Sequence, residues 1–217
     1  MKKLTHSLTA LALVMPLALH AQANDPTKNV ADGGVKVAGW EARTDGGEPV
    51  ANLKFVQMGP GFHVTSGPAA IYFNPAHASS GNFTAKASMT QTKVPEHREA
   101  YGIFVAGDDL KEASQNYLYF VVAHTGEYTI KHRGGANVHT VVDWTKNAAI
   151  KAPDASGRST NELAIEAGAS EIRFLVNGTE VHKAARSGML RAADGVAGLR
   201  VNHNLDVHVG SFSVTKM

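Results

Sequence analysis

Apolar and polar residues alternate with a period of two over most of this 217-residue chain. Within residues 82–91, every second position is apolar, namely Phe83, Ala85, Ala87 and Met89. Successive side chains of a strand point to opposite faces, so this pattern predicts a strand with one buried and one solvated face. Similar stretches recur at residues 53–58, 61–66, 69–73, 101–107, 117–122, 128–133, 138–144, 161–167, 171–177, 179–184, 196–202 and 205–214.

Turn-forming residues separate these predicted strands. They occur at Asn74–Pro75, His124–Glu127, Gly134–Gly135 and Asn177–Gly178, and the last pair is the strongest two-residue hairpin signal in the chain. Because no long helical period interrupts the strands, we expect an all-β fold, an antiparallel two-sheet jelly-roll sandwich of about 12–14 strands.

One short segment has a helical signal. Asp109 stands three residues before Glu112, which resembles a capping box and predicts a single helical turn.

The first 23 residues are typical of a secretory signal peptide. Two lysines precede an apolar run from Leu8 to Leu19, and Ala21-Gln22-Ala23 comes before a polar segment. We therefore predict a signal peptide at residues 1–23, a flexible arm at 24–34 and a single jelly-roll domain at 35–217. The expected product is soluble, in the periplasm or outside the cell, with no membrane span because the apolar run is too short to remain as one.

Charge and cysteine content narrow the classes of function. The leader holds two of the 21 basic residues and none of the 19 acidic ones, so the cleaved chain is formally neutral. This balance gives no electrostatic footprint for nucleic acid. The chain has no cysteine, which excludes disulfides, thiolate metal ligands, a cysteine nucleophile and a lipid anchor on an N-terminal cysteine.

Several sequence pieces between Val64 and Val214 resemble a known superfamily. They are a strand ending in Gly-Ile-Phe, an Asn-Tyr-x-x-Phe strand, a Val-Asp-Trp, a Phe-x-Val-Asn-Gly hairpin and a Gly-Leu strand near the end. This order is similar to the concanavalin A-like, laminin-G-like jelly rolls of bacterial secreted proteins, and in particular to the DUF1080, or 3-keto-disaccharide hydrolase-like, group. The resemblance implies a jelly-roll fold and a saccharide as ligand or substrate.

The acidic motif of glycosidases with this fold is absent. Those enzymes carry an E-x-D-x-E or E-x-D-x-x-E run on one strand face, whereas Ala164 stands between Glu162 and Glu166 here. The sequence therefore favours binding without cleavage, and we assign no catalytic residue.

The hairpin at residues 116–135 provides the candidate ligand-binding residues. If Ala123 pairs with Tyr128, Tyr119 lies across from His132. Together with Arg133 and Trp144, these side chains offer stacking surfaces and hydrogen-bond donors to a polyhydroxylated ligand. The alternative is structural, with Trp144 closing the edge of the core and Arg133 an exposed cation.

Histidines and acids raise the question of a metal. His132 and His139 come near each other across a predicted turn, but two imidazoles do not form a closed zinc site. Asp108 and Asp109 are weak calcium candidates, since capping of the predicted helical turn accounts for the same acids. We expect no metal and no cofactor.

These observations favour a secreted, non-catalytic binding domain with a glycan as its ligand. Two alternatives remain open: a glycoside-active enzyme, either a hydrolase of the 3-keto-disaccharide type or a lyase, and a structural or accessory periplasmic protein.

Overall fold

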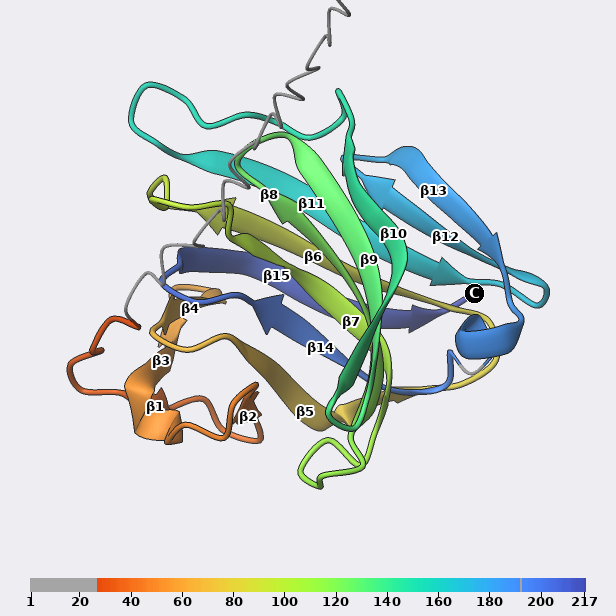
Figure 1. The fold of residues 1–217 in the computed structure, drawn as a ribbon, viewed down its shortest axis with the longest axis horizontal. Helices are drawn as coiled ribbons and strands as arrows, with labels where there is room; N and C mark the ends of the chain where they lie inside the picture. The colour runs from red at the N-terminus through yellow and green to blue at the C-terminus, as the bar shows by residue number, and fades with distance from the viewer. Residues whose placement is uncertain (1–26, 192) are drawn as a thin grey trace, which may run out of the picture.

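The computed structural model describes residues 27–217 except Ala192, and these residues form two stacked β-sheets (Figure 1). The eight-stranded sheet has, in spatial order, β1 (Gly34–Val35), β3 (Leu53–Met58), β4 (Gly61–Ser66), β15 (Asp206–Lys216), β6 (Phe83–Gln91), β11 (Ser159–Ala167), β12 (Glu171–Val176) and β13 (Thr179–Ala185). The seven-stranded sheet has β10 (Asn137–Lys146), β9 (Glu127–Gly134), β8 (Asn116–Ala123), β7 (Ala100–Asp108), β14 (Gly195–Val201), β5 (Ala70–Ser79) and β2 (Glu41–Thr44).

The predicted fold class is confirmed. Every strand pairing is antiparallel except the short one between β1 and β3. The only helical elements among the described residues are two 3₁₀ turns, η1 (Val50–Asn52) and η2 (Gly188–Leu190). The strands that the alternation pattern did not predict are β1 and β2, which are too short to show a period.

The main hydrophobic core fills the space between the two sheets. The expected inward residues of β6, from Phe83 to Met89, are fully buried there, and β8 contributes Leu118, Phe120 and Val122 from the opposite sheet. Each large apolar side chain buried in this way contributes roughly 1.5–3 kcal/mol to folding.

The register of the β8–β9 hairpin differs from the prediction by one residue. Ala123 pairs with Glu127 and Tyr119 pairs with Lys131, while His132 lies opposite Leu118. The cause is a three-residue loop, in which Gly126 takes a positive φ of 78° and donates its N–H to the Ala123 carbonyl. A shift of one residue exchanges the two faces of a strand, so His132 and Tyr119 project from opposite faces of the sheet.

The remaining expected turns have mixed outcomes. Asn177 and Gly178 have φ values of 51° and 78°, as a type I′ turn requires, so that hairpin is confirmed. The turn predicted at Gly134–Gly135 is also present and is tight, because Asn137 already pairs with Gly134.

Asn74–Pro75, predicted as a turn, lies inside β5 instead. The pairing of β5 with β14 jumps from Phe73 to Ala78, and β2 pairs only as far as Phe73. Proline is tolerated at this irregularity because the ladder needs no N–H from it.

The predicted helical turn at Asp109 is absent. The Glu112 N–H donates to the Asp109 carbonyl at 2.8 Å, forming a simple turn. The Asp109 carboxylate accepts a hydrogen bond from the Ser114 hydroxyl at 2.8 Å rather than from Glu112. The loop from residue 109 to 115 is therefore held by side-chain contacts and not by a helix cap.

The predicted signal peptide, residues 1–23, lies outside the described residues. In the part of the predicted arm that is described, the Lys28 N–H donates to the Asn204 side chain at 2.8 Å, and β1 pairs with β3. Within residues 27–217, leaving out Ala192, there is no helix of the length and apolarity needed to span a membrane.

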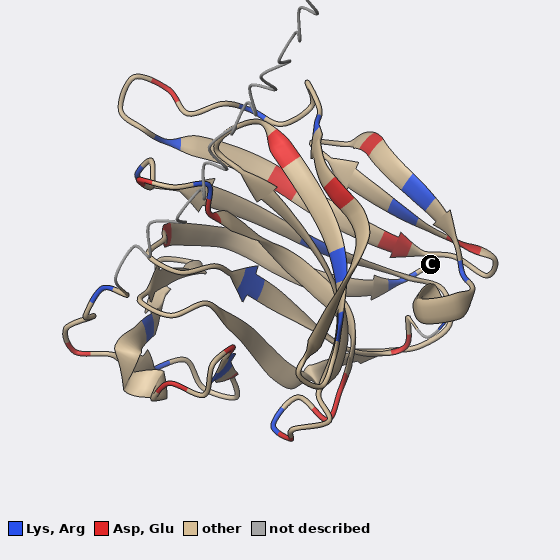
Figure 2. Cartoon of the chain, viewed as in Figure 1, with Lys and Arg blue, Asp and Glu red and all other residues tan. Residues whose placement is uncertain are grey.

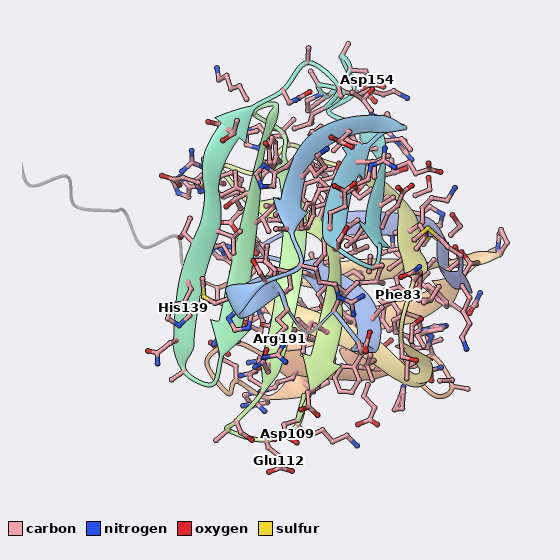
Figure 3. The ribbon with its side chains drawn as sticks, turned by 90° about the vertical axis from the view of Figure 1, so that its right-hand side faces the viewer. Phe83, Asp109, Glu112, His139, Asp154 and Arg191 are labelled. Carbon is pink, nitrogen blue, oxygen red and sulfur yellow. The ribbon has the colours of Figure 1, made fainter. Side chains whose placement is uncertain are left out.

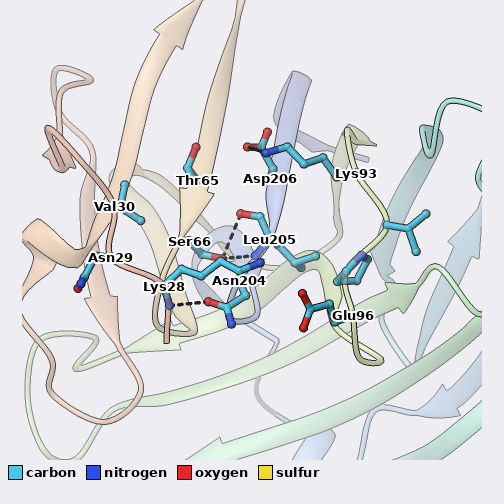
Figure 4. Close-up of a pocket in the computed structure, with 12 residues that line it drawn as sticks. Lys28, Asn29, Val30, Thr65, Ser66, Lys93, Glu96, Asn204, Leu205 and Asp206 are labelled. Carbon is cyan, nitrogen blue, oxygen red and sulfur yellow. Dashed lines mark hydrogen bonds and ion pairs between the residues drawn. The ribbon is translucent and has the colours of Figure 1, made fainter. Parts of the chain in front are cut away.

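A hollow of about 200 Å³ lies at one end of the sandwich, where residues 28–30 run past residues 93–96 (Figure 4). Asp206 lines its edge and accepts a hydrogen bond from Thr92 at 2.6 Å. His63 Nε2 lies 2.8 Å from the same carboxylate, and Lys93 Nζ lies 3.5 Å from it. The hydrogen bond with His63, with help from Thr92, lowers the pKa of Asp206 to about 2. These contacts join β4, β15 and the loop after β6.

The Asp206 contacts predict a specific loss of stability in acid. Because the folded-state pKa lies below the unfolded value, Asp206 stabilises the protein above about pH 4, and this contribution disappears as the pH falls towards 2. Asp206→Asn should lower the free energy of unfolding by on the order of 2 kcal/mol at pH 7. Urea unfolding at pH 7 and pH 2.5 should show the difference between the two proteins shrinking in acid. An equal difference at both pH values would contradict this account.

Candidate functional site

The outer face of the seven-stranded sheet, which points away from the main core, carries a buried polar cluster. Its members are Asp45, Tyr117, Tyr119, Arg133 and Arg200, and we call them the arginine–tyrosine cluster. Tyr117, Tyr119, Arg133 and Arg200 are each at least nine-tenths buried. Charged side chains are rarely buried, so a buried group of them on the solvent side of a sandwich marks this face as the candidate site.

Strand register places these side chains on one face. In one row across the sheet, Arg200 of β14 lies between Ile71 and Gly102. In the next row Tyr119 lies beside Lys131, and one step further Tyr117 pairs with Arg133. Asp45 follows directly after β2.

One carboxylate is shared by two guanidinium groups. Arg200 binds Asp45 through two hydrogen bonds, Nη1 to Oδ1 at 2.5 Å and Nη2 to Oδ2 at 2.6 Å. Arg133 Nη2 lies 3.2 Å from the same Oδ2. Burial opposes ionisation of Asp45, but the Arg200 and Arg133 charges outweigh it and hold its carboxyl pKa below the usual value. Burial likewise opposes the charge of Arg200, yet the nearby Asp45 carboxylate raises the guanidinium pKa.

The two tyrosines are packed against these charges. The Arg200 guanidinium carbon lies 5.3 Å from the Tyr119 ring centre, within range of a cation–π contact. Burial raises the pKa of both Tyr117 and Tyr119 and outweighs the opposing effect of the arginines, so both phenols stay protonated at neutral pH.

Three buried polar atoms of the cluster lack a well-formed hydrogen bond to any described residue. They are Nε of Arg133, Nε of Arg200 and the hydroxyl of Tyr117. The cluster therefore has more hydrogen-bond donors than its own residues satisfy.

A loop and a third arginine cover the neighbouring part of this face. Leu110, from the 109–115 loop, belongs with Phe104 and Tyr117 to a second apolar cluster that lies outside the main core. Arg43 Nη1 donates to the carbonyl oxygens of Leu110 at 3.3 Å and Glu112 at 2.5 Å. The 109–115 loop, held by Arg43, therefore borders the outer face beside the cluster.

Trp144 lies on the same face and already has a partner. It packs against the apolar cluster on the outer face, and the Arg98 guanidinium lies 4.4 Å from the centre of its ring. Arg98 Nη1 is 3.5 Å from Glu127. The indole is therefore a half-buried platform covered by a cation rather than a bare stacking surface.

His132 does not join the site. It projects from the opposite face of β9, where Nε2 lies 2.9 Å from the Asn116 side-chain oxygen. Its ring stacks on the directly paired His139, with centres 6.1 Å apart. Burial, followed by the His139 charge, lowers the pKa of His132.

The predicted weak metal ligands are also engaged elsewhere. Asp108 accepts the Asp109 N–H at 3.0 Å. Asp109 and Glu112 lie in a loop at one end of the sandwich, and His139 lies on the edge strand (Figure 3). Among the described residues, no three His, Asp or Glu side chains gather as a metal site requires.

Of the four predicted binding residues, the structure brings together Tyr119 and Arg133, and it places Trp144 on the same face. Sequence reasoning missed Asp45, Tyr117 and Arg200. A signal for Arg200 exists, since it is the one charged residue in the apolar strand at 195–201. Asp45 has no comparable signal, because it lies in a glycine-rich turn after a four-residue strand.

Lys and Arg are interspersed with Asp and Glu over the strands and loops in the view of Figure 2. The positive excess of the cluster is thus a local feature and not part of a basic surface.

Comparison with solved structures gives similarity to the carbohydrate-binding module CBM66 from Bacillus subtilis, with a TM-score of 0.61 and 14% identity over 87% of this chain and 100% of that one. A Bacillus subtilis protein of unknown function with a galectin-like fold has a TM-score of 0.60 and 12% identity over 82% and 89% of the two chains. The fold is a galectin-like jelly roll.

A third similar structure is the Emp47p carbohydrate recognition domain, with a TM-score of 0.54 and 6% identity over 87% and 93% of the chains. No protein-family model matches the chain. No curated protein matches it either. At these identities the comparisons establish the jelly-roll fold alone.

Proposed function

We propose that this protein is a secreted, non-catalytic carbohydrate-binding domain whose site is the arginine–tyrosine cluster. The observation that carries the proposal is the buried pairing of two guanidinium groups with one carboxylate and two tyrosines on the outer face of a jelly-roll sheet. Such a set offers planar donors and aromatic surfaces to a polyhydroxylated ligand. Two of the similar structures are named as carbohydrate-binding proteins, which supports the same class of ligand.

Binding without cleavage fits the chemistry of the cluster. Glycoside hydrolysis ordinarily uses two carboxyl groups, and Asp45 is the only acid in the cluster. Burial raises the pKa of Tyr117, so its phenol is a poor general base at neutral pH.

Arg133→Met should abolish retention on a glycan affinity matrix while preserving the fold. The substitution removes the less well paired guanidinium and leaves the two bonds between Arg200 and Asp45 intact. Because Asp45 keeps Arg200 as its counter-charge, no buried charge is left unpaired, so we expect the free energy of unfolding to stay within about 1 kcal/mol.

Trp144→Ala should weaken retention through loss of the platform. Lys183→Ala, on β13 of the other sheet, serves as the control. Retention of the Arg133→Met variant equal to that of the Lys183→Ala control would refute the assigned site.

A glycan array combined with assays on ordinary and 3-keto disaccharides separates the proposal from its alternative. Release of free sugar would assign a glycoside-active enzyme like those of the 3-keto-disaccharide group. Retention without release supports a binding domain.

We propose further that export removes residues 1–23, which follows from the leader pattern in the sequence. Intact-mass measurement of the periplasmic or secreted protein should then give a chain that begins at Asn24. A chain that retains Met1 would contradict export by cleavage.

A further inference from the structure

The arginine–tyrosine cluster has a positive charge that its own residues do not balance. Both oxygens of Asp45 are engaged by Arg200, and Arg133 shares one of them at the longer distance of 3.2 Å. A further hydrogen bond of the Arg133 guanidinium is long, 3.4 Å from Nη1 to the Gly135 carbonyl. Two guanidinium charges therefore face a single carboxylate.

The excess positive charge of the cluster lies in a mostly buried position, where an unpaired charge lowers the stability of the fold. The Arg133 side chain is only 10% exposed, and the Asp45 side chain is 28% exposed, so neither is fully shielded from solvent. An incompletely paired charge in such a place destabilises the folded protein unless something else compensates it. Arg133 is thus poised to gain from a second anionic partner.

A second cation lies next to it. Lys131 is two residues before Arg133 on β9, on the same face and opposite Tyr119. No Asp or Glu of the described chain forms an ion pair with Lys131. Alternate residues of a strand are about 7 Å apart, which places both cations within reach of one sugar residue.

We propose that the ligand of this face is an acidic saccharide, recognised by a carboxylate that binds Arg133 and is supported by Lys131. This inference rests on the proposed carbohydrate-binding function and specifies its substrate class. Carboxylate is favoured because a planar guanidinium matches it with paired hydrogen bonds, as Arg200 already does with Asp45. The Tyr117 side chain is fully buried beneath this position and packs beneath the ligand rather than contacting it. Arg200 acts as a positioning residue, since it fixes Asp45 and is itself buried.

The test compares ligands that differ in one charge. Isothermal titration with an oligogalacturonate, its methyl ester and sodium acetate uses the same protein throughout. We expect the acid to bind at least about tenfold more tightly than the ester, because the ester cannot accept paired, charge-assisted hydrogen bonds from Arg133. The advantage should fall as salt rises.

Two variants locate the effect. Lys131→Gln should reduce the preference for the acid by about threefold to tenfold without altering the circular dichroism spectrum. Lys183→Gln, on the other sheet, should leave it unchanged. Arg133→Lys keeps the charge but loses the planar fork, so it should retain only part of the preference.

Each outcome has a distinct meaning. Equal affinity for acid and ester would overturn the acidic-ligand inference while leaving carbohydrate binding in place. If acetate binds as tightly as the oligosaccharide, the ligand is a small carboxylate, and the inference of a saccharide ligand is overturned. If no carbohydrate binds here or on the array, the proposed function itself fails.

Discussion

Replacing Asp45 by asparagine is expected to lower the free energy of unfolding by about 2–4 kcal/mol. The substitution leaves Arg200 and Arg133 close together without their shared counter-charge, and Arg200 is almost completely buried. Breaking a fully buried pair costs about 3–5 kcal/mol, and the partial exposure of Asp45 reduces that figure. Urea denaturation at pH 7 measures the change.

Two further variants make this prediction specific. Asp32→Asn removes an acid from an exposed ion pair with Lys36, so its unfolding curve should stay close to that of the unmodified protein. Adding Arg133→Met to Asp45→Asn should restore part of the lost stability, because one of the two unbalanced charges is then gone. If Asp45→Asn and Asp32→Asn have equal effects, the cluster does not hold the face together as described.

Gly198→Val is expected to destabilise the protein by about 3 kcal/mol. A Cβ at Gly198 would lie 2.3 Å from the Tyr72 carbonyl oxygen and 2.5 Å from the Phe104 ring, so backbone or ring must move. Because the Phe104 ring packs on Tyr117, with centres 5.3 Å apart, the displacement should spread into the cluster and alter the near-ultraviolet circular dichroism spectrum.

Gly134→Val provides the matched control. There an added Cβ meets only the His132 ring at 3.6 Å, an ordinary contact. Its melting temperature should be close to that of the unmodified protein. A Gly198→Val variant that melts with the control would show that this part of the outer face is not tightly packed.

The fold could be predicted because the buried faces of long strands alternate in sequence. The inward residues of β6, from Phe83 to Met89, follow that rule, whereas β8 is buried on both faces. Local φ values were also predictable where an Asn-Gly pair allowed one turn type, at Asn177–Gly178.

Register could not be predicted at the β8–β9 hairpin. Near Gly134 the two faces of β9 end in His132 and Arg133, and both of these side chains are polar. The sequence there does not indicate which face is buried. The observed pairing is closed by a loop in which Gly126 has a left-handed conformation. A glycine in a loop allows several turn types, so the sequence did not single this one out.

Only some of the residues of the candidate site could be predicted from the sequence. Arg133 and Tyr119 could be named because both lie in the hairpin that the turn residues predicted, whereas Asp45 comes from a segment without a strand pattern. Asp45 and Arg200 are separated by 155 positions, and no local rule connects residues so distant. Their pairing is a product of sheet order, which places β14 between β7 and β5.

The position of β15 has a consequence for how the protein folds. This strand lies between β4 and β6 in the middle of the eight-stranded sheet, as the ribbon in Figure 1 shows. A growing chain that has not reached residue 206 lacks the strand that joins the two halves of that sheet. Pairings between segments so far apart in sequence form slowly, since a long loop must close first. The eight-stranded sheet can therefore be completed only after β15 has been synthesised.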